Sequence, residues 1–150
     1  MIRKVCLPLW IKDSYKLRNM VEWIAKVAYR IAGEDQLKNV GEGTTPISKA
    51  EATSLWYMLM NKKGILINLY EKEKGSGGDK VAEMLSQDFS MPRWKKAALK
   101  NAMVLRTKKR YLLSITFFLL ANDVSAALQV IKQSLNDPIL AILTCRMLAL

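Results

Sequence analysis

The sequence contains no histidine among its 150 residues. Histidine is the commonest general base near neutral pH and the commonest metal ligand, so its absence excludes histidine-dependent catalytic triads and histidine-containing zinc sites. The two cysteines, Cys6 and Cys145, lie near opposite ends of the chain and have no metal-ligand or redox spacing. Such sparse cysteine usage indicates a reducing compartment.

The sequence also lacks a hydrophobic run long enough to cross a membrane. The longest apolar run, Tyr111–Ala121, contains Ser114 and Thr116 and is shorter than the roughly 20 residues of a spanning helix. We expect it to be a buried helix. The apolar segment Val5–Ile11 is interrupted by Pro8 and leads to no cleavage pattern, so no secretory signal is predicted.

Acidic residues are in the minority, at 13 against 24 lysines and arginines, which gives a formal charge of +11. This balance favours an acidic partner surface, and charge alone does not choose between nucleic acid, anionic lipid and an acidic protein. The glutamates show no spacing typical of paired catalytic carboxylates. We therefore expect no enzymatic activity, no metal and no cofactor.

Apolar residues recur at three- and four-residue spacing along most of the chain, and no segment alternates convincingly as a strand would. The pattern predicts an all-α fold of about seven or eight helices in one region over 1–150, with loops near 33–47 and 71–79. Asp13 or Ser14 is expected to cap the first long helix, and Gly33 to end it.

Short motifs indicate three further helix boundaries. Ser48 and Glu51 have the spacing of a capping box, in which the serine hydroxyl and the glutamate carboxylate each accept a backbone N–H. The helix that follows is expected to end at Lys62–Gly64, with Gly64 in the left-handed conformation. Pro92 fits the first position of a later helix, which places Trp94 in its first turn.

From Trp94 onward the sequence predicts four helices joined by short turns, which makes neighbouring helices antiparallel. Antiparallel pairs stacked in this way form an α-solenoid segment. The final helix runs to Leu150 without a polar capping face. We therefore expect the chain to be a fragment of a longer scaffold.

The helix that begins at Pro92 and the turn after it hold a dense set of cations with no acidic residue among them. On helices these residues form one ridge that faces a partner, or a solvated face whose long stems cover apolar neighbours. The sequence leaves both interpretations open. The candidate ridge consists of Arg93, Lys95, Lys96, Lys100, Arg106, Lys108, Lys109 and Arg110.

Several aromatic residues stand beside aliphatic ones at helical spacing. This is typical of core packing, although aromatic side chains also anchor interfaces. We expect Trp56, Tyr57, Phe89, Trp94, Phe117 and Phe118 to be packing residues.

Four ordered segments also match a known family. They are Trp10–Asp13 with Leu17-Arg18 and Ile24–Lys26; Ala52–Met58 with Lys62-Lys63 and Leu69-Tyr70; Asp88–Ser90 with Arg93-Trp94 and Ala97–Ala102; and Phe117–Ala121 with Ala126-Ala127 and Leu135–Ile142. Together they resemble the conserved helical region of the rabconnectin or DmX-like family, which includes the large subunit of the RAVE complex. The third segment is the most specific.

The resemblance implies a non-enzymatic cytoplasmic scaffold without cofactors, peripheral to endosomal or vacuolar membranes. It also implies protein partners among the subunits of the vacuolar proton pump and its assembly complex, so that the chain promotes assembly of the vacuolar-type proton-transporting ATPase and organelle acidification. Family members normally carry WD-repeat propellers before this region. The sequence lacks them, in line with the expected fragment.

Two other functions stay open at this point. A basic helical module that binds nucleic acid would account for the charge, although no helix-turn-helix or zinc-finger motif is visible. A truncated product without independent function would account for the apolar flank of the last helix.

Overall fold

The computed structural model describes residues 10–38, 47–73 and 77–150, with side chains in the first range described only as far as residue 32. These ranges contain eight α-helices and a short π-helical segment, and no strand occurs within them. The predicted all-α fold is confirmed.

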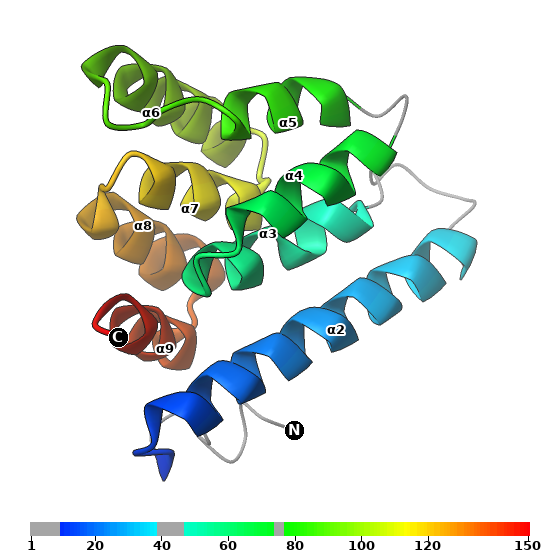
Figure 1. Cartoon of the computed structure of the whole chain (residues 1–150), viewed down its shortest axis with the longest axis vertical. Coiled ribbons are helices and arrows are strands. Elements are labelled where there is room, and N and C mark those ends of the chain that lie inside the picture. Colours follow the sequence, from blue (N-terminus) through cyan, green and yellow to red (C-terminus); the bar gives the residue numbers. More distant parts are fainter. Residues whose placement is uncertain (1–9, 39–46, 74–76) are drawn as a thin grey trace.

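Figure 1 shows these helices stacked in layers across the molecule. In chain order they are α2 (Ser14–Lys38), α3 (Lys49–Leu59), α4 (Lys63–Lys72), α5 (Gly78–Leu85), α6 (Pro92–Thr107), α7 (Tyr111–Leu120), α8 (Val124–Val130), the π-helical segment η1 (Ile131–Leu135) and α9 (Pro138–Leu148).

Helices α3 and α7 form the centre of the stack. α3 packs against α2, α4 and α7, whereas α7 packs against α3, α6 and α8. Every residue of α7 from Leu113 to Leu120 is buried, which confirms the buried helix expected over Tyr111–Ala121. The packing order α2, α3, α7, α6 therefore places α2 and α6 at opposite ends (Figure 1).

The first helix is longer than the sequence predicted. α2 continues through Gly33 to Lys38, so the expected stop at Gly33 is wrong. A single glycine costs a helix only about 1 kcal/mol, and the glutamate, glutamine, leucine and lysine that follow it are good helix formers. The remainder of the expected loop, 39–46, lies outside the described residues.

The break expected near 71–79 is shorter than predicted, because α4 extends to Lys72 and α5 begins at Gly78. Residues 74–76 lie outside the described part of the chain. Gly64 is also wrongly placed as a helix end, since it lies inside α4 and the left-handed residue is Asn61, with φ of 57°. Asparagine tolerates this conformation because its short polar side chain bonds locally.

The helix starts predicted at Asp13 and Pro92 are confirmed, and the starts of α8 and α9 use the same two devices. Asp13 Oδ1 accepts the backbone N–H of Tyr15 at 2.8 Å, and Asp123 and Asp137 accept those of Ala126 and Leu140, both at 3.0 Å. Pro92 and Pro138 occupy the first turns of α6 and α9. Each boundary is fixed within a few residues of sequence.

The inner face of α2 contains Leu17, Val21, Ala25 and Ala32, all of them buried. The three- and four-residue spacing of apolar residues continues to Ile31 and predicts it on this face, but Ile31 is 51% exposed. The cause is helical geometry, because a step of about 100° per residue turns Ile31 away from the line through the four buried residues. One side of α2 is thus left outside the core.

Two glycines provide a matched test of this packing. A Cβ at Gly64 meets nothing within 4 Å, whereas a Cβ at Gly78 would lie 2.6 Å from the Tyr70 carbonyl oxygen. We expect Gly64→Ala to raise stability by about 0.5 kcal/mol through helix propensity, and Gly78→Ala to lower it by more than about 1 kcal/mol through the clash. Urea unfolding followed by circular dichroism measures both; shifts of the same sign would contradict the packing.

Candidate functional site

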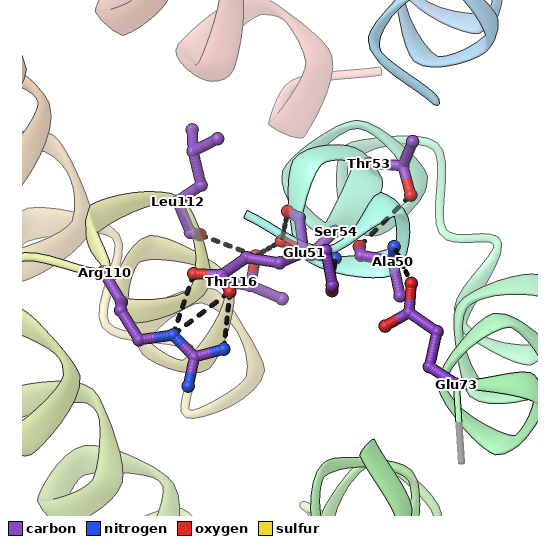
Figure 2. A network of polar contacts seen from close by, with 9 residues as sticks. Ala50, Glu51, Thr53, Ser54, Glu73, Arg110, Leu112 and Thr116 are labelled. Carbon is purple, nitrogen blue, oxygen red and sulfur yellow. Dashed lines mark hydrogen bonds and ion pairs between the residues drawn. The ribbon is translucent and has the colours of Figure 1, made fainter. Parts of the chain in front are cut away.

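A polar network joins the central helices α3 and α7, and its main contact is the ion pair between Glu51 and Arg110 (Figure 2). Arg110 Nε donates to the two carboxylate oxygens of Glu51 at 3.0 and 3.1 Å, and Nη2 also donates to Oε2. The Glu51 side chain is 7% exposed and that of Arg110 41%. The hydrogen bond to Glu51 raises the pKa of Arg110.

The predicted capping box is only half formed. Ser48 Oγ accepts the backbone N–H of Glu51 at 3.1 Å, as the motif requires. The Glu51 carboxylate, which was expected to bond at the helix start, instead meets Arg110 from the turn before α7. A carboxylate from another helix end bonds at the start of α3 instead. Oε1 of Glu73, at the end of α4, accepts the backbone N–H of Ala50 at 2.9 Å.

Buried hydroxyls extend the network along the α3–α7 contact. Thr116 Oγ1 donates to the Leu112 carbonyl at 2.9 Å and lies 3.2 Å from Ser54 Oγ, whose hydroxyl donates to the Glu51 carbonyl at 2.8 Å (Figure 2). The neighbouring Tyr70 hydroxyl has its pKa raised by burial and by the Glu51 charge. The Ser54 and Thr116 hydroxyls and the Glu51–Arg110 pair are engaged in helix contacts, which makes the network structural.

The described residues offer little for chemistry. No group of three histidine, cysteine, aspartate or glutamate side chains that could hold a metal ion is found among them. A shallow depression of about 250 Å³ lies between α2, α3 and α4, lined by Lys26, Tyr29, Tyr57 and Leu69. This lining includes no carboxylate, and its lysine, Lys26, is paired with Glu22, which lies outside the lining.

The structure divides the predicted basic ridge into three groups. Arg93, Lys96 and Lys100 are exposed on α6 at the three- and four-residue spacing of one helix face. Lys108 and Lys109 are exposed in the turn after it. The other three members, Lys95, Arg106 and Arg110, are half-buried.

Two of the half-buried members have partners inside the chain. Arg110 binds Glu51, and Arg106 Nη2 donates to Gln133 Oε1 on η1 at 3.1 Å. Arg110 therefore does not belong to an outward ridge, and local spacing could not reveal this because Glu51 lies 59 residues earlier in the chain. Lys108 and Lys109 remain exposed in the turn, and on α6 itself one exposed side, called here the α6 outer face, consists of Arg93, Lys96, Lys100, Met103, Val104 and Thr107.

Met103 and Val104 are the members of this face that the sequence analysis did not single out. They are 56% and 44% exposed and follow Lys100 by three and four residues. Their helical spacing was a signal that could have found them. With no acidic residue anywhere in α6, the face combines unopposed positive charge with an apolar patch.

The segment before α6 fixes where this face begins. Asp88 Oδ1 accepts the Ser90 N–H at 2.9 Å and Oδ2 accepts its hydroxyl at 2.8 Å, and the backbone bond lowers the pKa of Asp88. Phe89 packs against the core beside this turn. Pro92 then starts the helix.

The six predicted packing residues have different surroundings. Phe117 and Phe118 are buried in the core, and Trp56, Tyr57 and Phe89 pack against it while half-buried. Trp94 is half-buried at the edge of α6, where the Arg93 guanidinium lies 5.1 Å from the centre of its ring. This cation–π contact ties one basic side chain of the α6 outer face to the helix.

The fold and these surfaces define an all-α helical stack with charged outer faces. Within the described ranges, each helix is too short or too polar to cross a bilayer. The chain belongs to the RAVE protein 1 C-terminal family, whose model matches residues 1–149. The predicted family resemblance is thereby confirmed.

Relatives from an animal and from a fungus have similar sequence identity to this chain. DmX-like protein 1 of Mus musculus is 30% identical over 146 residues, which cover 97% of this chain and 4% of the mouse protein. Regulator of V-ATPase in vacuolar membrane protein 1 of Saccharomyces cerevisiae is 32% identical over 140 residues, covering 86% of this chain and 10% of the yeast protein. The chain thus spans a small part of these relatives.

The Glu51–Arg110 pair can be tested by removing its positive partner. Arg110→Met keeps the apolar stem and leaves the buried carboxylate uncompensated, so we expect a loss of about 2–3 kcal/mol, between the values of exposed and fully buried pairs. Urea unfolding measures the loss. Lys96→Met, which removes an exposed cation, is the control and should stay within about 0.5 kcal/mol of the unsubstituted chain. An equally small effect of Arg110→Met would contradict the assignment.

Proposed function

We propose that this chain is a non-enzymatic scaffold segment that promotes assembly of the vacuolar-type proton-transporting ATPase and thereby organelle acidification. The observation that carries the proposal is the family match over residues 1–149, together with the yeast relative's name as a regulator of V-ATPase in the vacuolar membrane. The short stacked helices support a scaffold, since stacks of this kind present extended binding surfaces.

The proposed contact surface is the α6 outer face. Its three cations, Arg93, Lys96 and Lys100, lie on one side of a helix that has no carboxylate, and the exposed Met103 continues that side. A partner of matching chemistry is an acidic protein surface with a small apolar contact, because opposite charges steer association and apolar burial holds the complex. Subunits of the pump or of its assembly complex are the proposed partners.

A charge-reversal experiment tests this surface. We expect Lys96→Glu/Lys100→Glu to weaken binding of the chain to purified V-ATPase by about tenfold or more, because attraction becomes like-charge repulsion. Binding is measured with immobilised chain against the intact pump and against its separated soluble and membrane sectors. The control, Lys80→Glu/Lys132→Glu, makes the same charge change at exposed positions on α5 and η1.

Equal weakening by both variants would show general charge attraction and contradict a specific α6 contact. If the well-folded chain binds neither sector nor the assembly complex, the proposed function itself is wrong. Binding of the chain to short duplex and single-stranded DNA and RNA probes is measured as well. The comparisons do not favour a nucleic-acid module, and tight, salt-dependent binding of these probes alone would replace the scaffold proposal.

A further inference from the structure

The side of α2 that faces away from α3 carries exposed aromatic and basic residues. Tyr15 is 72% exposed and Trp23 56%, and Lys16, Asn19 and Arg30 are exposed with them. At about 100° per residue these five positions fall within an arc of about 100°, opposite the buried Leu17, Val21 and Ala25. We call this surface the α2 outer face (Tyr15, Lys16, Asn19, Trp23 and Arg30).

The electrostatics of α2 favour an anionic ligand. Between Ser14 and Ala32 the helix carries Lys16, Arg18, Lys26 and Arg30, against one acidic residue, Glu22. Glu22 Oε1 lies 3.1 Å from Lys26 Nζ and its Oε2 lies 2.9 Å from Lys62 Nζ, and these contacts, led by the bond from Lys62, lower its pKa. Glu22 is therefore already neutralised by lysines, and Asp13, the carboxylate just before α2, accepts the backbone N–H groups of Tyr15 and Lys16.

The aromatic content separates this surface from the α6 outer face. The α6 outer face exposes an aliphatic chain and a thioether, Val104 and Met103, whereas the α2 outer face exposes a phenol and an indole. Trp10, 76% exposed, stands just before α2 and adds a third ring to this end of the molecule. Tryptophan and tyrosine favour the headgroup region of a bilayer, where one edge of the ring meets water and the body meets acyl chains.

We propose that the α2 outer face binds the surface of membranes that contain anionic lipids, with α2 lying in the headgroup plane. Tyr15 and Trp23 insert their rings between headgroups, while Lys16 and Arg30 extend their apolar stems along the interface and pair with lipid phosphates and carboxylates. A helix with aromatic residues among cations on one face is the composition that interfacial helices use.

Membrane contact through α2 also determines how the rest of the stack is oriented. Since α2 and α6 lie at opposite ends of the packing order, a chain that rests on a membrane through α2 directs the α6 outer face away from it (Figure 1). The two basic surfaces can then be occupied at the same time, one by lipid and one by a protein.

Vesicle flotation of the 150-residue chain tests the proposal. We expect the chain to float with vesicles of phosphatidylcholine and phosphatidylserine and to stay unbound with phosphatidylcholine alone. Lys16→Ala/Arg30→Ala should reduce partitioning by about 20- to 30-fold, at about fivefold for each cation removed near an anionic surface. Tyr15→Ser/Trp23→Ser should also release the chain, through loss of the inserted rings.

Two controls on α6 make the test specific. Met103→Ser removes a side chain with the same 56% exposed fraction as Trp23, and Lys96→Ala/Lys100→Ala removes two cations from the opposite end. Both should retain vesicle binding, and thermal melts confirm that all variants fold. Loss of binding by the α6 variants to the same extent would show diffuse charge attraction and overturn the proposal.

Absence of flotation with anionic vesicles at low salt would also overturn it. A third outcome would also contradict the proposal: the α2 variants bind vesicles as well as the unsubstituted chain does, but no longer bind the separated soluble sector of the pump. The α2 outer face would then be a protein contact. The vesicles contain no protein, so their result is independent of the proposed role in V-ATPase assembly.

Discussion

The arrangement of this chain depends on the ion pair between Glu51 on α3 and Arg110 at the start of α7. A carboxylate that is 7% exposed is costly to bury, and only a matched cation with good geometry compensates for it. The alternative placements of α7 against α3 would leave that carboxylate unpaired. The pair therefore selects one register for the two central helices, and the buried Ser54 and Thr116 hydroxyls follow the same contact.

The positions of the outer helices, α2 and α6, depend on this central contact between α3 and α7. α2 packs on α3, and α6 packs on α7, where Ser114 Oγ donates to the Ala102 carbonyl at 2.8 Å. Each outer helix buries small or aliphatic residues inward and exposes cations outward. Part of the basic excess, 24 lysines and arginines against 13 acidic residues, thus lies on the outer faces of α2 and α6, and the proposals assign a different ligand to each.

Local features were predictable from the sequence, and long-range pairings were not. The caps at Asp13, Asp123 and Asp137 and the helix start at Pro92 are each determined within a few residues. The helix through Gly33 was missed because a single glycine costs a helix only about 1 kcal/mol, and several of the residues that follow it are good helix formers. The Arg110 contact was missed because the Ser48–Glu51 motif offered Glu51 a local role, and its real partner comes from a distant segment. The three- and four-residue spacing of Arg93, Lys96 and Lys100 can be read from the sequence, but the predicted ridge did not separate these three from its other five cations.

Hydrogen exchange in increasing urea tests most directly whether α3 and α7 act as one unit. The account predicts that the amides of these two helices are the slowest to exchange, share one opening free energy and lose protection together. It further predicts that α2 and α6 open at lower free energy while α3 and α7 remain protected. Protection that persists in α7 after α3 has opened, or the reverse, would contradict the claim that their contact determines the rest of the structure.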